Sequence, residues 1–281
     1  MTTHEIARPA PVEAQPRTDR NTNAEAGGVV GFSPVDHASW LRFLARYALL
    51  AVMIDLITWP LVVLWFLPAS QGSPLAPAYD ELVAATHSPG VYRVLITLDV
   101  AGWLMLGIFL ITLAALFARH APIRSTLVAA CGIGQVAGMS GAFLRLTGIS
   151  DLAAHYVTAA PDQKAALLRS FLDLQLVINS LFTAGGTLWA IAFVLAASAA
   201  WSSAAFPRWL AGLIALPGIL NLTSNLFEMV TGSEILFVVN IVSVFLLTVV
   251  NFAVAGVFWR HAWAFSRRSG DAAQPHTLEG V

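Results

Sequence analysis

Long apolar runs separated by short polar segments dominate the pattern of the chain. A hydrocarbon core about 30 Å thick requires roughly 20 apolar residues from a spanning helix. The runs that meet this requirement lie at residues 43–67, 91–118, 124–147, 173–199, 208–230 and 235–260. Because lipid offers no partner for backbone N–H and C=O groups, each run is predicted to be a helix. The pattern therefore predicts an all-α integral membrane protein, a bundle of six transmembrane helices.

Two proline positions indicate where helices begin. Pro89 follows Ser88, and Pro161 stands before the sequence DQKAALL. A Ser cap and a proline in the first turn both favour a helix start. The second signal is predicted to open a short amphipathic helix at 161–171, lying on the membrane surface before the fourth span.

The two ends of the chain differ in character from the spans. MTTHEIARPAPVEAQPRTDRNTNAEAGG mixes Pro, Ala, Thr, Asn and charged residues without apolar periodicity, which is typical of disorder. It lacks the apolar core of a signal peptide, and RRSGDAAQPHTLEGV at the other end is similar in composition. The predicted organisation is a disordered tail at 1–38, a transmembrane domain at 39–263 and a disordered tail at 264–281.

Composition narrows the functional classes. Hydrophobic residues make up 57% of the chain and charged residues 11%, against roughly 25% charged in soluble proteins. A formal net charge of −1 argues against a nucleic-acid partner. The single cysteine, Cys131, excludes an intrachain disulfide, and no CxxC pattern occurs. The histidines fall in tails, loops and span ends, so we expect no metal, haem or other cofactor.

The basic residues are unevenly divided between the two sides of the predicted bundle. Cytoplasmic segments of membrane proteins carry an excess of Lys and Arg. An even number of spans places both termini on the richer side, so we predict an inner (plasma) membrane protein with cytoplasmic termini (N-in/C-in). The other side receives Arg93, Lys164 and Arg169. The richer side receives Arg8, Arg17, Arg20, Arg42, Arg46, Arg119, Arg124, Arg208, Arg260, Arg267 and Arg268.

Polar side chains inside the spans concentrate in the outer half of the predicted bilayer. A charge near the bilayer centre costs about 2.5–3.5 kcal/mol, so these groups are not expected to face lipid. In GILNLTSNLFEMV, the polar residues Asn221, Asn225 and Glu228 are spaced four and then three residues apart, which places them on one helix face. We therefore predict one outward-facing polar pocket. Its predicted residues are Asp55, Asp99, Gln135, Arg145, Asp173, Gln175, Asn179, Asn221, Asn225, Glu228 and Asn240.

The predicted pocket holds more acids than bases. Asp55, Asp99, Asp173 and Glu228 face the single cation Arg145. Arg145 is predicted to pair with Asp173 or Glu228, which lie at similar depth. The remaining acids are then wetted, hydrogen-bonded or protonated. Asp55 is the deepest and the best candidate for a neutral, proton-carrying acid.

Small and amide side chains in the spans also have a purely structural interpretation. Asn and Gln in membrane helices often bond only to neighbouring helices, for about 0.6 kcal/mol on average. Gly134 and Gly138 in CGIGQVAGMSGAF form a small-xxx-small pair that allows close helix approach. Packing within the chain and homodimerisation through this pair are both open.

Three features resemble an uncharacterised bacterial family of membrane proteins, the domain of unknown function number 4386. They are VYRVLITLDVAGWLMLGIFLITLAALF, FPRWLAGLIALPGIL, and the order of spans with a longer polar insertion between the third and fourth. The resemblance covers roughly residues 45–262. It implies the arrangement of spans two to six and brings no activity with it.

Three functions are compatible with these observations. The first is a binding or regulatory membrane protein whose pocket holds a small or lipid-like ligand. The second is a terpene-cyclase-like intramembrane enzyme, in which Asp55 or Asp99 protonates an isoprenoid or lipid and rings such as Trp59 and Trp103 shield a carbocation. The third is a proton-coupled transporter with Asp55 as carrier, which the lack of a visible internal repeat makes less favourable.

Overall fold

The computed structural model describes residues 34–62, 64, 79–118, 120–203, 206–231 and 237–272, and this part of the chain consists of helices and short connections without a strand. Within it, five helical segments are long and apolar enough to cross a membrane. The predicted all-helical membrane fold is confirmed at this level. The predicted first span falls on α1 (Pro34–Leu61), which is not among the five. The five are Pro89–Phe117, Pro122–Thr158, Pro161–Trp201, Arg208–Thr231 and Val242–His261.

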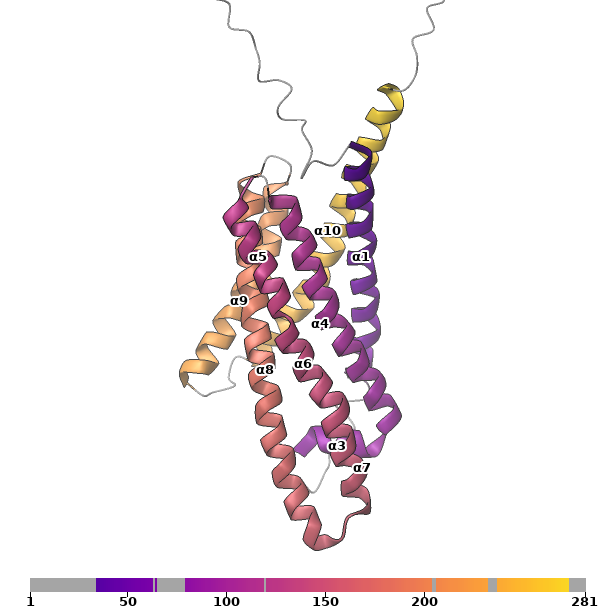
Figure 1. Cartoon of the computed structure of the whole chain (residues 1–281), viewed down its shortest axis with the longest axis vertical. Helices are drawn as coiled ribbons and strands as arrows, with labels where there is room; N and C mark the ends of the chain where they lie inside the picture. The colour runs from indigo at the N-terminus through magenta and orange to yellow at the C-terminus, as the bar shows by residue number, and fades with distance from the viewer. Residues whose placement is uncertain are drawn as a thin grey trace, which may run out of the picture.

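The long helices run side by side along one axis (Figure 1). The start of α1 and the end of α10 lie at one end of the bundle, here the termini end. The short helix α3 and the connection between α7 and α8 lie at the other, here the hairpin end. Helix α1 packs mainly along α10, and α8 packs mainly along α9. The remaining elements are α3 (Asp80–His87), α4 (Pro89–Phe117), α5 (Pro122–Gly134), α6 (Val136–Leu144), the π-helical segment η4 (Arg145–Ile149), α7 (Ser150–Thr158), α8 (Pro161–Trp201), α9 (Arg208–Thr231) and α10 (Phe237–Ala272).

Two apolar cores occupy the two ends of the bundle. The core at the termini end includes Phe117, Phe193 and Phe258, and the core at the hairpin end includes Ile149 and Phe171. Along α4 and α8, the residues between these two cores include the polar side chains described below. The polar groups are therefore held in a layer between two rigid apolar blocks.

Glycines allow α6 and α8 to approach closely. A Cβ on Gly185 of α8 would lie 2.8 Å from the backbone nitrogen of Gly138, and a Cβ on Gly134 would lie 2.6 Å from Leu188 Cδ1. A Cβ on Gly138 would overlap the ring of Trp103. The pair formed by Gly134 and Gly138 is therefore packed against other helices of the same chain. Homodimerisation through this pair stays a prediction.

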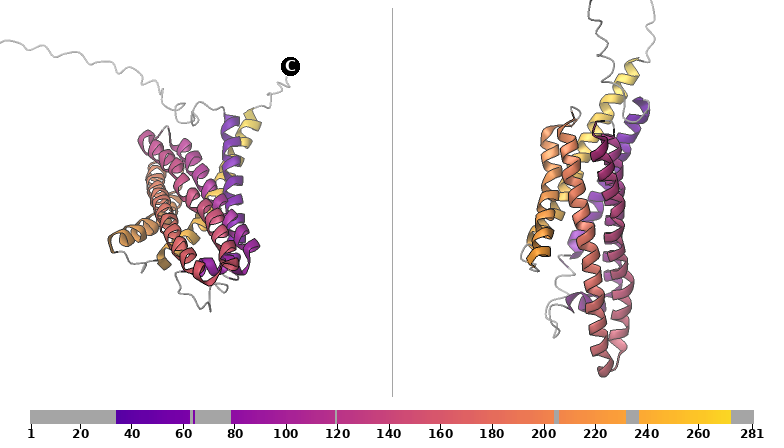
Figure 2. Two further views of the ribbon diagram at one scale, coloured as in Figure 1. Left: turned by 60° about the horizontal axis from the view of Figure 1, so that its bottom comes forward. Right: turned by 60° about the vertical axis from the view of Figure 1, so that its left-hand side comes forward.

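Both proline start signals are confirmed, but the helix that begins at Pro161 is longer than predicted. Helix α8 runs unbroken from Pro161 to Trp201, so the prediction of a separate surface helix at 161–171 is wrong. No Gly or Pro interrupts the sequence before Gly185, and nothing therefore ends the helix. The predicted third span, 124–147, likewise continues to Thr158. The resulting hairpin of α7 and α8 projects beyond α9 (Figure 2).

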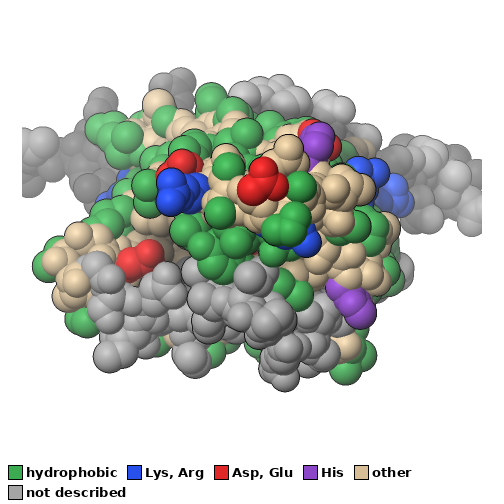
Figure 3. Space-filling model, turned by 90° about the horizontal axis from the view of Figure 1, so that it is seen from below, with side chains coloured by type: hydrophobic (Ala, Val, Ile, Leu, Met, Phe, Trp, Pro, Cys, Tyr) green, Lys and Arg blue, Asp and Glu red, His purple; other side chains and the backbone are tan. Residues whose placement is uncertain are grey.

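Helices also extend into the predicted tails. Because α1 begins at Pro34 and α10 ends at Ala272, residues 34–38 and 264–272 are helical. The rest of both tails, 1–33 and 273–281, lies outside the described residues. Seen from the hairpin end, acidic and basic side chains are interspersed among apolar ones on the described part of the surface (Figure 3).

Candidate functional site

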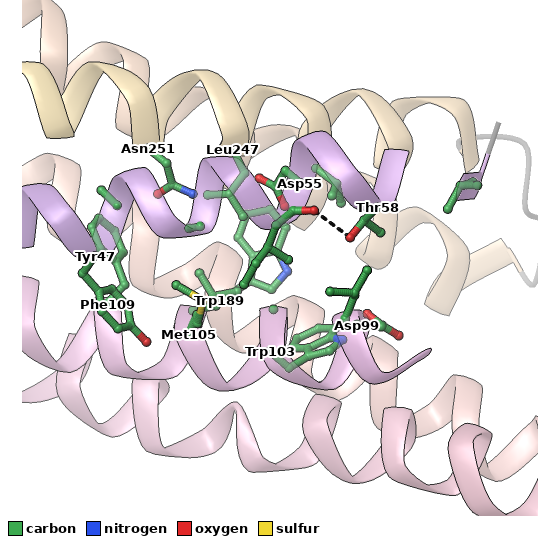
Figure 4. Close-up of a pocket in the computed structure, with 18 residues that line it drawn as sticks. Tyr47, Asp55, Thr58, Asp99, Trp103, Met105, Phe109, Trp189, Leu247 and Asn251 are labelled. Atoms are coloured by element: carbon green, nitrogen blue, oxygen red, sulfur yellow. Dashed lines mark hydrogen bonds between the residues drawn. The ribbon is translucent and has the colours of Figure 1, made fainter. Parts of the chain in front are cut away.

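A cavity of about 290 Å³ lies between α1, α4 and α10, with one wall completed by α8. We call it the first cavity. Asp55 of α1 and Asp99 of α4 approach it from opposite sides (Figure 4). Most of its wall is apolar or aromatic, and Asn251 of α10 adds an amide. Its aromatic residues are Tyr47, Trp103, Phe109 and Trp189.

Asp55 links α1 to α10. The Thr248 hydroxyl donates a hydrogen bond to Asp55 Oδ2 at 2.6 Å. Thr58, one turn beyond Asp55, instead donates to the carbonyl of Ile54 at 2.9 Å (Figure 4). Among the described residues no second donor reaches the Asp55 carboxylate. Within the described part of the chain, this carboxylate is therefore hydrogen-bonded only from α10.

A second cavity, of about 360 Å³, adjoins the first between α4, η4, α8 and α9. Its lining is more polar and includes Arg145, Asn221, Asn225 and Glu228. The predicted single pocket is therefore two adjoining cavities. Four residues line both of them and form their common wall: Asp99, Trp103, Trp189 and Val244.

Arg145 forms ion pairs with two acids. Its Nε lies 2.6 Å from Glu81 Oε1, and its Nη1 lies 3.3 Å from Asp99 Oδ2. The hydroxyl of buried Tyr92 donates to the same Glu81 oxygen at 2.7 Å. The Phe182 ring lies beneath the guanidinium, with its centroid 5.5 Å from Arg145 Cζ. We call Glu81, Tyr92, Asp99 and Arg145 the ion cluster.

The predicted partners of Arg145, Asp173 and Glu228, are therefore wrong. Asp173 is exposed and lines neither cavity, and Glu228 lines the second cavity without an ion pair to Arg145. The acid that sequence reasoning missed is Glu81, which lies on α3. The first turn of that helix is acidic, and Leu82 and Ala85 are buried behind it. This amphipathic pattern, with acids at a helix start, is the signal that could have identified α3.

Arg145 opens the π-helical segment η4. A π turn holds an extra residue, so the side chains after it are rotated about the helix axis relative to an α-helix. Such segments are rare and occur often at functional sites. Here the segment coincides with the cation of the ion cluster.

An amide network joins α8, α9 and α10 beside the second cavity. Asn225 Nδ2 donates to Asn221 Oδ1 at 3.1 Å and to Thr187 Oγ1 of α8 at 3.3 Å. Asn221 Nδ2 lies 3.5 Å from Ser243 Oγ of α10. Both asparagines are at most 3% exposed. Asn221, Asn225 and Glu228 share one face of α9, here called the stripe on α9. This face points inward, where it bonds to α8 and α10 and lines the second cavity.

The structure brings together most of the predicted site residues. Asp55 and Asp99 line the first cavity, and Asp99, Arg145, Asn179, Asn221, Asn225 and Glu228 line the second. Three others line neither: Asp173, Gln175 and Gln135, the last of which is buried and donates to the Cys131 carbonyl. The side chains of Asn240 and Trp59 lie outside the described residues. Residues missed at the site are Glu81, Tyr92, Trp189, Thr248 and Asn251.

One family matches most of the chain. It is described as domain of unknown function (DUF4386), and the match spans residues 61–265. The chain belongs to the DUF4386 family. The DUF4386 match includes the ion cluster and the stripe on α9, while Asp55 lies before its start. Comparisons with curated proteins and with solved structures give no match.

Proposed function

We propose that this DUF4386 protein is a multi-pass inner-membrane protein with six spans, cytoplasmic termini and a transmembrane domain at 39–263. α1 is the sixth span in this proposal, because its 28 residues reach about 40 Å at 1.5 Å per residue. Helix α1 packs along α10, and the start of α1 and the end of α10 both lie at the termini end (Figure 1). These two observations support an even number of crossings. Arg42, Arg46 and Arg124 near the termini end support its cytoplasmic orientation.

Cysteine labelling tests this orientation. In a Cys131→Ser background, Thr158→Cys at the hairpin end is expected to react with a membrane-impermeant maleimide in intact cells. His120→Cys at the termini end is expected to react only after the cells are broken. Both positions are exposed, so poor reactivity cannot be attributed to burial. Labelling of His120→Cys in intact cells would contradict the proposal.

We further propose that the two cavities bind a small or lipid-like ligand from the membrane. The observation that carries this proposal is the first cavity, an aromatic and apolar space inside the helix layer with two carboxylates directed into it. Ligand sites typically measure about 300–1,000 Å³ and combine apolar walls with a few convergent polar groups.

Two glycines offer a matched test of ligand binding. Gly102 lines the first cavity and Gly212 lies on the exposed side of α9, and a Cβ on either would meet nothing within 4 Å. Gly102→Leu is expected to fill the cavity, while Gly212→Leu leaves it unchanged. The probe is 3-trifluoromethyl-3-phenyldiazirine, a small neutral photolabel, and labelled residues are mapped by peptide mass spectrometry.

In the wild type and in Gly212→Leu, we expect labelling of Met105 and Leu106 in the cavity wall. In Gly102→Leu, we expect that labelling to fall by about tenfold, with labelling of the exposed Leu104 unchanged. Equal labelling of the cavity wall in both variants would refute a ligand-sized cavity in the folded protein.

An acid-catalysed enzyme acting on an isoprenoid or lipid is the second candidate. It is favoured by the position of Asp55 in the same cavity as Trp103 and Trp189, whose rings can shield a cation. In that case Asp55→Asn abolishes turnover of the substrate while photolabelling of the cavity persists. Proton-coupled transport through the adjoining cavities predicts substrate-driven proton movement in proteoliposomes instead.

A further inference from the structure

Carboxyl groups outnumber basic groups in the wall of the first cavity. Of the described residues that line it, two are acids, Asp55 and Asp99, and none is Lys or Arg. Arg145 reaches Asp99 only through the longer of its ion pairs, at 3.3 Å, because its 2.6 Å pair is with Glu81. One guanidinium is therefore shared between two carboxylates, and Asp55 has no basic partner among the described residues. A cationic ligand in this cavity would provide these carboxyl groups with a counter-charge in apolar surroundings.

The aromatic residues of the same cavity suit an organic cation. The rings of Tyr47, Trp103, Phe109 and Trp189 contribute to its wall. Trp103 follows Asp99 by one helical turn, and its indole ring lies beside the carboxylate (Figure 4). The Trp103 indole N–H hydrogen-bonds to the Asp99 carboxylate. A carboxylate at an aromatic wall is a favourable combination for an alkylammonium group, which gains both charge pairing and a cation–π contact.

Two polar groups at the first cavity lack partners. Asn251 is only 7% exposed, and its side chain makes no hydrogen bond within the described part of the chain. The buried hydroxyl of Tyr47 is also unpaired there. A fully buried polar atom such as the Tyr47 hydroxyl oxygen is rarely left unsatisfied in native proteins. The Asn251 amide, directed from α10 toward the cavity (Figure 4), is therefore available to a polar group on a ligand.

The walls do not suit an inorganic divalent cation. Calcium takes 6–8 oxygen ligands, and magnesium requires nearly ideal octahedral geometry. Within the described residues no group of three or more His, Cys, Asp or Glu side chains comes together to hold a metal. A cavity of about 290 Å³ lined largely by apolar side chains has room for an organic body that contacts the rings.

We propose that the first cavity binds a small organic cation, a quaternary or protonated amine with an apolar body. Its charged group lies between Asp55 and Asp99 and beside the Trp103 ring, and its apolar part contacts Trp189. This inference rests on the proposed ligand-binding function and specifies the chemical class of the ligand.

Two probes of the same shape test whether the cavity prefers a positively charged ligand to a neutral one. Benzyltrimethylammonium and neopentylbenzene differ in having nitrogen or carbon at one position, so the first carries a permanent positive charge and the second is neutral. Binding to the purified full chain in nanodiscs is measured as protection of Met105 and Leu106 from the diazirine photolabel. The cation is expected to protect at a concentration at least about tenfold lower than its neutral isostere.

Substitutions at Asp55 test whether the preference for the cation over the neutral probe arises in the first cavity. Asp55→Asn keeps the shape of the side chain and removes its charge, and we expect it to weaken protection by the cation about tenfold without changing protection by neopentylbenzene. Asp55→Glu keeps a carboxylate at this position and is expected to keep the preference for the cation. The control is Asp162→Asn, because Asp162 is exposed and lines neither cavity.

Equal protection by the two probes, unchanged in Asp55→Asn, would overturn the cation inference and leave the proposed ligand cavity in place. Absence of protection by either probe would overturn the inference as well. If Asp55→Asn fails to fold, the comparison of the two probes on the wild type and on Asp55→Glu still tests the cation inference. The proposed function is decided separately, by photolabelling of Gly102→Leu against Gly212→Leu.

Discussion

Replacing Arg145 with Met is expected to lower the free energy of unfolding by about 3 kcal/mol. Arg145 is 21% exposed and Glu81 10% exposed at the side chain, so water compensates little for the missing cation. The substitution keeps an unbranched side chain of similar length and leaves Glu81 and Asp99 without a counter-charge. Removing one partner of a buried ion pair costs more than the pair itself contributes, because the remaining charge stays in apolar surroundings.

Unfolding in mixed detergent micelles measures this loss. The control is Arg169→Met on α8, an exposed arginine without an ion pair among the described residues. The double variant Arg145→Met with Glu81→Gln is expected to recover part of the stability, because one uncompensated charge is removed. A loss for Arg145→Met no larger than that for Arg169→Met would mean that water already solvates the ion cluster.

The same substitution has a local consequence at the hairpin end. Helix α3 is held to the bundle by Leu82 and Ala85 in the apolar core and by the two bonds to Glu81. An eight-residue helix is too short to be stable alone. Loss of the Arg145 bond therefore allows α3 to open locally, and hydrogen exchange at residues 80–87 reports this opening.

The long helices were predictable because the membrane imposes one strong rule on the sequence. A spanning helix needs a long apolar run, and each such run could be read directly. Pro89 and Pro161 also indicated two helix starts, since proline is favoured in the first turn of a helix. The length of α8 was missed because the polar residues before the fourth span were read as a separate surface segment.

The candidate site was predictable in composition and less so in its contacts. Helical spacing placed Asn221 and Asn225 on one face, and the cost of polar groups in lipid predicted that this face points inward. Depth along a helix does not give direction around it, however, and Asp173 faces outward although its depth matches that of Arg145. The Arg145–Glu81 pair joins residues 64 positions apart, and it depends on how α3 packs against α4 and α7. No local pattern encodes that contact.

The division into two cavities was also beyond the sequence. Trp103 and Trp189 form much of the common wall, and both occur within apolar runs where a large side chain is unremarkable. The Trp103 ring lies against Gly138 and Gly185, where α6 and α8 approach closely, and a side chain at either glycine would overlap it. The glycines therefore determine the shape of the site although they carry no chemistry.

Replacing Gly185 with Ala is expected to lower the free energy of unfolding by about 3 kcal/mol, at the upper end for overpacking. The new Cβ would lie 2.8 Å from the backbone nitrogen and 2.9 Å from the Cα of Gly138. Backbone atoms of a packed helix cannot rotate away as a flexible side chain can, so α6 and α8 must separate. Close contact between small residues is a main source of helix association in membranes, and it is lost along this interface.

Two further glycines provide a graded control for Gly185→Ala. At Gly141, the Cβ would lie 3.3 Å from the carbonyl oxygen of Ile178, and at Gly212 it would meet nothing within 4 Å. The expected loss in micelle unfolding is therefore largest for Gly185→Ala, smaller for Gly141→Ala and absent for Gly212→Ala, where Ala is the better helix former. Similar losses at all three positions would contradict a tight α6–α8 interface. A Cβ on Gly185 would also lie 3.0 Å from the Trp103 ring, which is part of the wall between the two cavities. Gly185→Ala is therefore expected to change photolabelling of both cavities as well, which links this packing contact to the site.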